Sequence, residues 1–275
     1  MKYSKISLFI PDSNPPYFIG SQIRGAFGYA LKRVVCINPS YRCEECFAKK
    51  DCLYYEAYEL KNSYHPYRFD FELGKKHYDF SIYLFEHFAQ KLPYFLSALH
   101  KMVSQIGFTK DRIKYKNFEL YLNDLSCYKN AEIKIEKEFI KSIEKDTFCP
   151  NISIRFVTQL RLKKRNRLIG GKDLELYDIV NSIYQRSLKL CGKSFERLPF
   201  DPKGEIVMRR LDFIDLNRYS NRQNTMMKFG GIIGEIKIDN LDVKSYNILK
   251  KGEIIGVGKQ TVFGLGKIVV EKLNE

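Results

Sequence analysis

Apolar residues recur at helical spacing in three long stretches of the chain. In the first stretch Ile23, Phe27, Ala30, Leu31 and Val34 mark one face, which should pack against a core. Two later stretches show the same periodicity, and a shorter amphipathic segment follows near the end. The pattern predicts helices over residues 21–35, 86–106, 174–191 and 242–249.

The segments between these helices are typical of β-strands. Strands are expected at residues 5–10, 68–73, 79–84, 115–125, 153–162, 204–216, 227–238, 254–257 and 263–270. Residues 131–137 form either a link or an edge strand. The order strand, helix, strand, strand, helix, strand describes the first half of the chain, and in the second half strands again surround two helices, although the two halves show no clear sequence repeat. This order predicts an α+β protein with tandem ferredoxin-like domains at residues 1–127 and 128–275.

The charge balance narrows the class of partner. The chain has 47 Lys and Arg against 32 Asp and Glu, a formal net charge of +15. Such a chain favours a polyanion such as nucleic acid, with an acidic membrane as the weaker alternative. Its 19 Tyr and 20 Phe could stack on bases. No run approaches the length of a spanning helix and no signal peptide opens the chain, so we expect a cytoplasmic protein.

A glycine-rich tract lies near the end of the chain, with two Gly-x-Gly pairs around one lysine. It is typical of neither a dinucleotide fingerprint nor a phosphate-binding P-loop, because strands are expected on both sides. It forms either a tight hairpin or a loop whose free amides and lysine bind phosphate. The residues expected to contact a nucleic-acid backbone are Gly256, Gly258, Lys259, Gly264 and Gly266.

Four of the seven cysteines cluster in a short polar segment. Cys36, Cys43, Cys46 and Cys52 have the spacing C-x6-C-x2-C-x5-C, which suits a structural zinc ion or an iron–sulfur cluster. Free loop cysteines are the alternative. Four thiolates would leave no open coordination position, so we predict no catalytic role for such a metal.

Two further polar segments are candidates for nucleic-acid contact. The densest basic run carries Arg161, Lys163, Lys164, Arg165 and Arg167, and no acidic residue lies between positions 155 and 172. A solvated face is the alternative, but clustered like charges favour a polyanion. A second set contains groups that could pair with phosphates or base edges, or could simply form a polar loop: Arg218, Arg222 and Gln223.

Three stretches together resemble the CRISPR-associated repeat-RNA endoribonucleases of the RAMP superfamily. They are residues 23–36 (IRGAFGYALKRVVC), the continuation through the cysteines to Tyr54, and residues 218–234 followed by the glycine tract. The resemblance implies tandem ferredoxin-like domains and binding of CRISPR repeat RNA. It also implies cleavage without a metal ion, in which the 2′-hydroxyl attacks the adjacent phosphate and leaves a cyclic phosphate and a 5′-hydroxyl.

The resemblance places the catalytic groups on or beside the first helix, facing the glycine-rich loop. That region offers Tyr17, Arg24, Tyr29 and Lys32. Many relatives use a histidine there, whereas the first histidine of this chain is His65. Our hypothesis is that Arg24 and Lys32 stabilise charge and that His65 or Tyr17 carries the proton.

Two other functions fit the same features. One is a non-catalytic RNA-binding subunit of a CRISPR effector complex, which the absence of an early histidine favours. The other is a metal-ribbon DNA-binding regulator, which lacks any helix-turn-helix or finger spacing to support it. The sequence leaves open whether the protein is a monomer or a homodimer.

Overall fold

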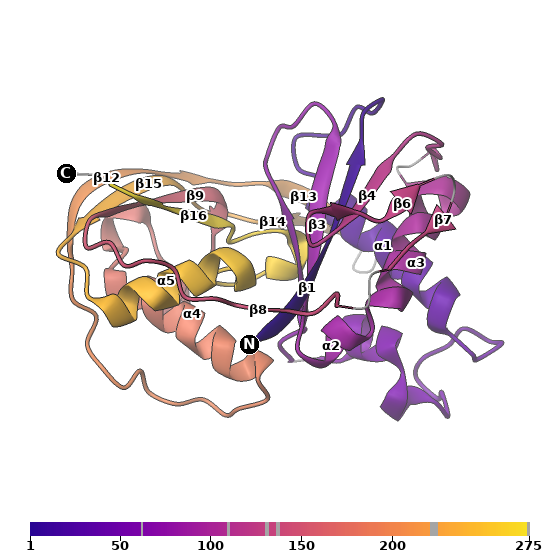
Figure 1. Ribbon diagram of the computed structural model, residues 1–275, viewed down its shortest axis with the longest axis horizontal. Coiled ribbons are helices and arrows are strands. Elements are labelled where there is room, and N and C mark those ends of the chain that lie inside the picture. The colour runs from indigo at the N-terminus through magenta and orange to yellow at the C-terminus, as the bar shows by residue number, and fades with distance from the viewer. Residues whose placement is uncertain (62, 109–110, 130–131, 136–137, 221–224, 274–275) are drawn as a thin grey trace. The chain divides into compact units, whose positions relative to one another are not determined.

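The computed structural model describes residues 1–61, 63–108, 111–129, 132–135, 138–220 and 225–273. It shows a mixed α+β protein with antiparallel sheets (Figure 1). The chain divides into two compact units, residues 1–69 with 74–142 and residues 70–73 with 143–275. The boundary expected at residues 127 and 128 stays a prediction.

The first unit is built on a sheet with strand order β2-β3-β1-β4-β5. Ile6 at the centre of β1 lies opposite Ile82 of β3 and Leu122 of β4, so apolar residues share one face. The elements are β1 (Lys2–Ile10), α1 (Gly20–Val35), η1 (Lys49–Asp51), η2 (Tyr55–Glu59), β2 (Tyr67–Phe71), β3 (Tyr78–Phe85), α2 (His87–Gln90), α3 (Leu92–Lys101), η3 (Met102–Ile106), β4 (Glu119–Leu122), β5 (Leu125–Ser126), β6 (Tyr128–Lys129), β7 (Glu132–Ile133) and β8 (Lys141–Ser142), the last of which pairs with β1.

Helices α1 and α3 pack together over the core of this unit. Phe27 of α1 stacks on Phe95 of α3 at a centroid distance of 5.7 Å and meets Phe69 edge-on at 5.9 Å. The buried residues of α1 include Ile23, Phe27, Ala30 and Leu31, as its periodicity predicts. The single helix expected over residues 86–106 is instead divided into α2, α3 and η3, and Gly107 ends it with φ +77°.

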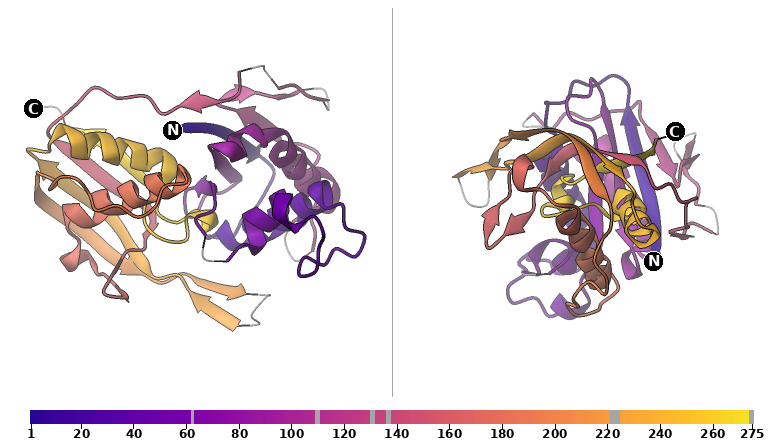
Figure 2. Two further views of the ribbon diagram at one scale, coloured as in Figure 1. Left: turned by 90° about the horizontal axis from the view of Figure 1, so that it is seen from below. Right: turned by 90° about the vertical axis from the view of Figure 1, so that its left-hand side faces the viewer.

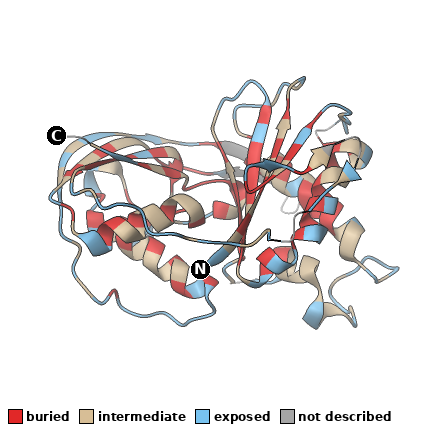
Figure 3. Ribbon diagram, viewed as in Figure 1, coloured by how far each residue is buried: buried red, intermediate tan, exposed pale blue. Residues whose placement is uncertain are grey.

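The second unit repeats the same connectivity. Its main sheet has the order β12-β15-β9-β16, and α4 and α5 lie together on one face of it (Figure 1). Buried residues line the inner sides of the helices and strands (Figure 3). The elements are β9 (Ile152–Leu160), β10 (Lys163–Lys164), β11 (Arg167–Leu168), η4 (Gly171–Asp173), α4 (Leu176–Leu190), β12 (Glu205–Ile214), β13 (Asn217–Ser220), β14 (Thr225–Lys228), β15 (Gly231–Asp239), α5 (Val243–Ile255), η5 (Thr261–Phe263) and β16 (Ile268–Lys272).

Two small hairpins extend from the second unit. The β13–β14 hairpin continues from the ends of β12 and β15 (Figure 2). The β10–β11 hairpin follows β9 and turns at Arg165 and Asn166, which have φ +49° and +64°. Both hairpins carry basic residues of the sequence-predicted sets.

The strand expected at residues 254–257 is wrong. Helix α5 begins after Asp242, whose carboxylate accepts hydrogen bonds from the amides of Lys244 and Ser245, and it continues to Ile255. The glycine tract therefore follows a helix rather than a strand. Within the described residues, no helix combines the length and apolar character needed to span a membrane.

The two glycines of α1 provide a matched test of packing. A Cβ at Gly28 would overlap the ring of Tyr58, whereas a Cβ at Gly25 would meet nothing within 4 Å. We expect Gly28→Ala to lower the free energy of unfolding by about 1–3 kcal/mol through overpacking. Gly25→Ala should raise it by roughly 0.5–1 kcal/mol through better helix propensity. Urea unfolding followed by circular dichroism measures both, and equal effects would contradict the packing of Tyr58 on α1.

Candidate functional site

A column of aromatic rings follows the cysteine-rich segment in the first unit. Tyr54 and Tyr58 of adjacent helical turns stack at a centroid distance of 5.4 Å with rings inclined by 3°. Tyr58 stacks on Tyr67 of β2 at 6.0 Å, and Tyr67 stacks on Phe88 of α2 at 6.4 Å. We call Tyr54, Tyr58, Tyr67 and Phe88 the aromatic column.

Helix α1 presents its cations to this column. Arg24, Gly28 and Lys32 are spaced four residues apart and therefore share one face of the helix. The Arg24 guanidinium lies 4.7 Å from the Tyr58 ring centroid, and the Lys32 ammonium lies 4.8 Å from that of Tyr54. The Tyr58 hydroxyl donates a 2.9 Å hydrogen bond to the Arg24 carbonyl. Glycine at position 28 leaves the space that the Tyr58 ring fills.

The charge state of this cluster is well defined. Enclosure raises the pKa of Tyr58 well above its ordinary value, and it also raises the pKa of Tyr67, so both phenols stay protonated at neutral pH. Burial on its own would lower the pKa of Arg24, but the phenolic oxygens of Tyr67 and Tyr58 outweigh it and raise that pKa. The guanidinium is therefore a fixed positive charge on an aromatic face.

The column also brings one predicted histidine close to these cations. The His65 ring lies 6.1 Å from that of Tyr67, and its Nδ1 is 3.3 Å from the carbonyl oxygen of Glu56. Arg24, Lys32 and His65 therefore lie against three different rings of the aromatic column. Tyr17 is 56% exposed and packs against Gly74, whose amide donates to the Tyr17 carbonyl at 2.9 Å. Tyr29 accepts a 2.9 Å hydrogen bond from Arg33 on the same helix.

Sequence reasoning missed the part played by the tyrosines. The spacing of Tyr54 and Tyr58 was the available signal, because residues four apart face the same side of a helical turn. It also missed Glu56 and His87, whose side chains meet at 2.7 Å across 31 positions of sequence. No local pattern connects residues that meet only through the tertiary fold.

The glycine tract differs from the open phosphate loop expected from the sequence. Gly256, Gly258, Gly264 and Gly266 have φ between +73° and +80°, a region that side chains disfavour. A Cβ at Gly258 would come within 2.6 Å of the Arg161 carbonyl oxygen, and one at Gly264 would overlap the Phe71 ring. The glycines are thus required by backbone conformation and by close packing.

The amides of the tract are mostly used within the protein. Lys259 donates to the Arg161 carbonyl at 2.9 Å, Gly258 to the Ser182 hydroxyl at 3.0 Å, and Gly266 to the Gln159 carbonyl at 3.1 Å. Gly256 and Gly264 donate to carbonyls of their own segment at 2.8 and 3.0 Å. These amides cannot also form an anion-binding concavity. What the tract exposes is the tip at Lys259 and Gln260.

Some residues of the basic run contact other groups of the protein, whereas others are exposed without an ion-pair partner among the described side chains. Arg161 donates to the Gly230 carbonyl and lies 5.4 Å from the Phe229 ring, and burial lowers its pKa. Lys164 is 2.8 Å from Glu175. Among the described side chains, none forms an ion pair with the exposed Lys163, Arg165 or Arg167 of the β10–β11 hairpin.

The third predicted set falls on the β13–β14 hairpin. Arg218 is a residue of β13, where the structure describes the backbone only. Arg222 and Gln223 lie outside the described residues. Their expected contact with nucleic acid stays a prediction.

The four clustered cysteines are free, half-buried thiols. Across the part of the chain that the structure describes, no three His, Cys, Asp or Glu side chains are placed to hold a metal ion. As placed, these thiols do not fit a four-ligand site, and binding would require the segment between Cys36 and Cys52 to draw them together. The metal site stays a prediction from their spacing.

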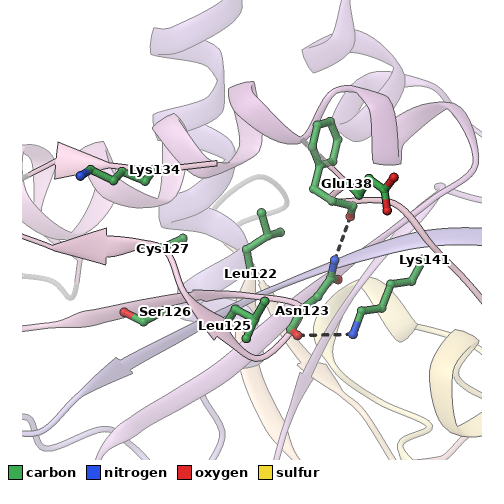
Figure 4. A pocket seen from close by; sticks show the side chains of 9 residues that line it. Leu122, Asn123, Leu125, Ser126, Cys127, Lys134, Glu138 and Lys141 are labelled. Atoms are coloured by element: carbon green, nitrogen blue, oxygen red, sulfur yellow. Dashed lines mark hydrogen bonds between the residues drawn. The ribbon is translucent and has the colours of Figure 1, made fainter. Parts of the chain in front are cut away.

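A shallow pocket lies beside the β4–β5 turn (Figure 4). The Asn123 side chain donates to the Phe139 carbonyl at 2.9 Å, and Lys141 approaches the Asn123 carbonyl at 3.5 Å. Burial raises the pKa of Cys127, which lines the pocket, to about 11. The thiol is therefore protonated and inert at neutral pH. The pocket is a packing feature of the chain segment that returns to β1.

The packing of the glycine tract gives a prediction about stability. Gly264→Ala should lower the free energy of unfolding by about 2 kcal/mol or more, since it combines a positive φ with overlap on Phe71. Lys259→Ala, at the exposed tip, should change it by less than about 0.5 kcal/mol. Denaturant unfolding measures both. A Gly264→Ala variant of unchanged stability but weakened RNA binding would show that the tract clamps RNA directly.

The cysteine spacing gives a second prediction. Elemental analysis of protein purified under reducing conditions should find about one zinc per chain, as four thiolates suit. The Cys43→Ser Cys46→Ser variant should contain none. Metal-free wild-type protein would show that the cysteines are ordinary loop thiols.

Comparisons with known proteins relate the chain to one family. Residues 154–268 match the family model of the CRISPR-associated endoribonuclease Cas6, and residues 11–130 match a model described as an N-terminal domain. A protein of Archaeoglobus fulgidus described as uncharacterized is 23% identical over 292 aligned positions, which cover 95% of this chain and 94% of that protein.

Solved structures with a similar fold include two Cas6 product complexes. The first has a TM-score of 0.59 and 17% sequence identity, and the match covers 98% of this chain and 99% of that structure. The second has a TM-score of 0.55 and 14% identity, and the match covers 99% of this chain and 100% of that structure. Thermus thermophilus Cas6 gives 0.55 at 14%, covering 98% of each chain. These likenesses establish the fold over nearly the whole length. The resemblance expected from the sequence is therefore confirmed: residues 154–268 match the Cas6 endoribonuclease family, and the chain has the fold of Cas6 proteins over nearly its whole length.

Proposed function

We propose that the protein is an endoribonuclease that cleaves CRISPR repeat RNA without a metal ion and releases guide RNA units. The family match of residues 154–268 supports the substrate class. The observation that carries the chemistry is the pair of cations, Arg24 and Lys32, held on aromatic faces of the first unit. The common strand order of the two main sheets supports tandem ferredoxin-like domains.

The proposed reaction is an attack of the 2′-hydroxyl on the adjacent phosphorus. The bond to the 5′-oxygen breaks, and the products are a 2′,3′-cyclic phosphate and a 5′-hydroxyl. Negative charge builds up on the phosphorane oxygens during this step, so fixed cations at that point lower the barrier. The face contact with Tyr58 holds the Arg24 guanidinium in place as a fixed positive charge. Lys32 would supply a second, point-like charge.

RNA binding is proposed to rest on exposed basic groups of the second unit. The β10–β11 hairpin offers Lys163, Arg165 and Arg167, and the glycine tract offers Lys259 at its tip. Arg161 supports the hairpin from within, because its guanidinium and carbonyl are both engaged. Phosphate contacts of this kind position the RNA and carry no sequence information by themselves.

Cleavage in the presence of EDTA tests the reaction type. Cognate repeat RNA incubated with protein and EDTA should be cut at one position and yield a cyclic phosphate end. Arg24→Ala should slow single-turnover cleavage by about 10²-fold, the usual effect of removing one charge stabiliser. Arg33→Ala is the matched control, since Arg33 lies on the same helix and contacts Tyr29 instead. Cutting that depends on added magnesium would contradict the proposal.

Repeat RNA that binds without being cut under any condition would point to the non-catalytic subunit instead. In that case the complex, rather than the free protein, would be the functional form. Preference for duplex DNA over single-stranded repeat RNA would contradict both the endoribonuclease and the RNA-binding subunit, and it would favour a DNA-binding regulator.

Salt dependence tests the hairpin. The slope of log binding constant against log salt should become shallower by about 0.7–0.9 for Arg165→Ala, because one phosphate contact is lost. Lys164→Ala should change the slope much less, since Lys164 is already paired with Glu175. Equal slopes for both variants would place the RNA elsewhere.

A further inference from the structure

One ionisable pair of the first unit has no part in the function proposed above. Nε2 of His87 lies 2.7 Å from Oε1 of Glu56, and the two side chains are 54% and 39% exposed. The pair is therefore accessible to a ligand. It lies beside the aromatic column, because the His87 ring meets Phe88 edge-on at 4.9 Å.

The surrounding structure fixes both partners. Glu56 lies in η2, between Tyr54 and Tyr58, and its carbonyl oxygen is the atom that His65 approaches. His87 is the first residue of α2, after Glu86, which has φ +48° and ψ −120°. Two 3.0 Å hydrogen bonds hold Glu86 to the backbone of Lys2. Such a backbone conformation is costly for a residue other than glycine and is typical of places where a side chain must be positioned.

The pair has the chemistry of a proton carrier. A carboxylate beside Nε2 accepts a hydrogen bond from Nε2–H, so the neutral imidazole keeps its proton on Nε2 and Nδ1 is an unprotonated acceptor. The same carboxylate stabilises the imidazolium that forms when Nδ1 takes up a proton. His65 differs, because its Nδ1 lies 3.3 Å from the Glu56 backbone carbonyl, a neutral group that supplies no negative charge to stabilise an imidazolium.

We propose that His87, oriented by Glu56, is the proton-transfer residue of the RNA cleavage; the inference rests on the function proposed above. Nδ1 takes the 2′ proton as the 2′-oxygen bonds to phosphorus. The bond between phosphorus and the 5′-oxygen then breaks, and the imidazolium gives the proton to that oxygen. The RNA ends carry a cyclic phosphate and a 5′-hydroxyl, and His87 returns to its neutral form.

Single-turnover cleavage in EDTA, with RNA binding measured in parallel, tests the assignment. His87→Ala should cleave about 10²-fold more slowly, the usual contribution of one general acid–base group. Its dissociation constant for RNA should stay near that of wild type. Glu56→Gln should cleave about tenfold more slowly, because the imidazole keeps its place but loses the charge that stabilises it. His77→Ala is the control, since His77 is exposed and contacts Phe9 instead.

Added imidazole decides whether His87 transfers a proton or only supports the fold. It should restore part of the cleavage by His87→Ala and leave His77→Ala unchanged. Two results would overturn this inference alone, provided that the wild-type protein cleaves. One is equal cleavage by His87→Ala, and the other is slow cleavage by His87→Ala that imidazole does not restore. Wild-type protein that binds repeat RNA but does not cleave it in EDTA overturns the proposed function and this inference together.

Discussion

The contact of Tyr58 with helix α1 is the interaction on which the polar groups of the first unit depend. Gly28 leaves room for the ring, the Tyr58 hydroxyl is bonded to the Arg24 carbonyl, and the Arg24 guanidinium lies over the ring face. One side chain therefore joins α1 to the segment that follows the cysteines. Because Glu56 lies in the same short helix as Tyr58, this contact also determines where Glu56 meets His87. The cations and the ionisable pair belong to one packed arrangement.

Glycine serves the same physical purpose in both units. At Gly28 and Gly264 the absence of a Cβ lets an aromatic ring approach the backbone, and at Gly266 it lets the Val257 carbonyl oxygen do so. The glycine tract is thus a tightly bonded structural loop. A loop with its amides engaged offers a ligand only the side chains at its tip, and for this reason the proposed phosphate contacts are assigned to Lys259 and to the basic hairpin.

Local patterns predicted the elements, whereas tertiary contacts determined the site. The apolar stripe of α1 and the strand order were readable because periodicity reports directly on burial. The end of α5 could not be predicted in this way, because Ile254, Ile255 and Val257 form a short apolar run that suits either a helix or a strand. Arg24, Lys32 and His65 were chosen as candidates from the sequence, and the structure brings each of them to a ring of the aromatic column. Glu56 and His87 could not have been paired, because only folding brings residues so far apart in sequence together.

The most direct test of the account is the cleavage rate of variants at Tyr58. Tyr58→Phe keeps the ring under Arg24 and loses one hydrogen bond, whereas Tyr58→Leu removes the ring that positions both α1 and Glu56. We predict near wild-type single-turnover cleavage in EDTA for Tyr58→Phe. For Tyr58→Leu we predict at least about a tenfold loss with little change in RNA affinity, as misplacing catalytic groups slows chemistry more than binding. Wild-type cleavage by a folded Tyr58→Leu variant would contradict the central role of this contact.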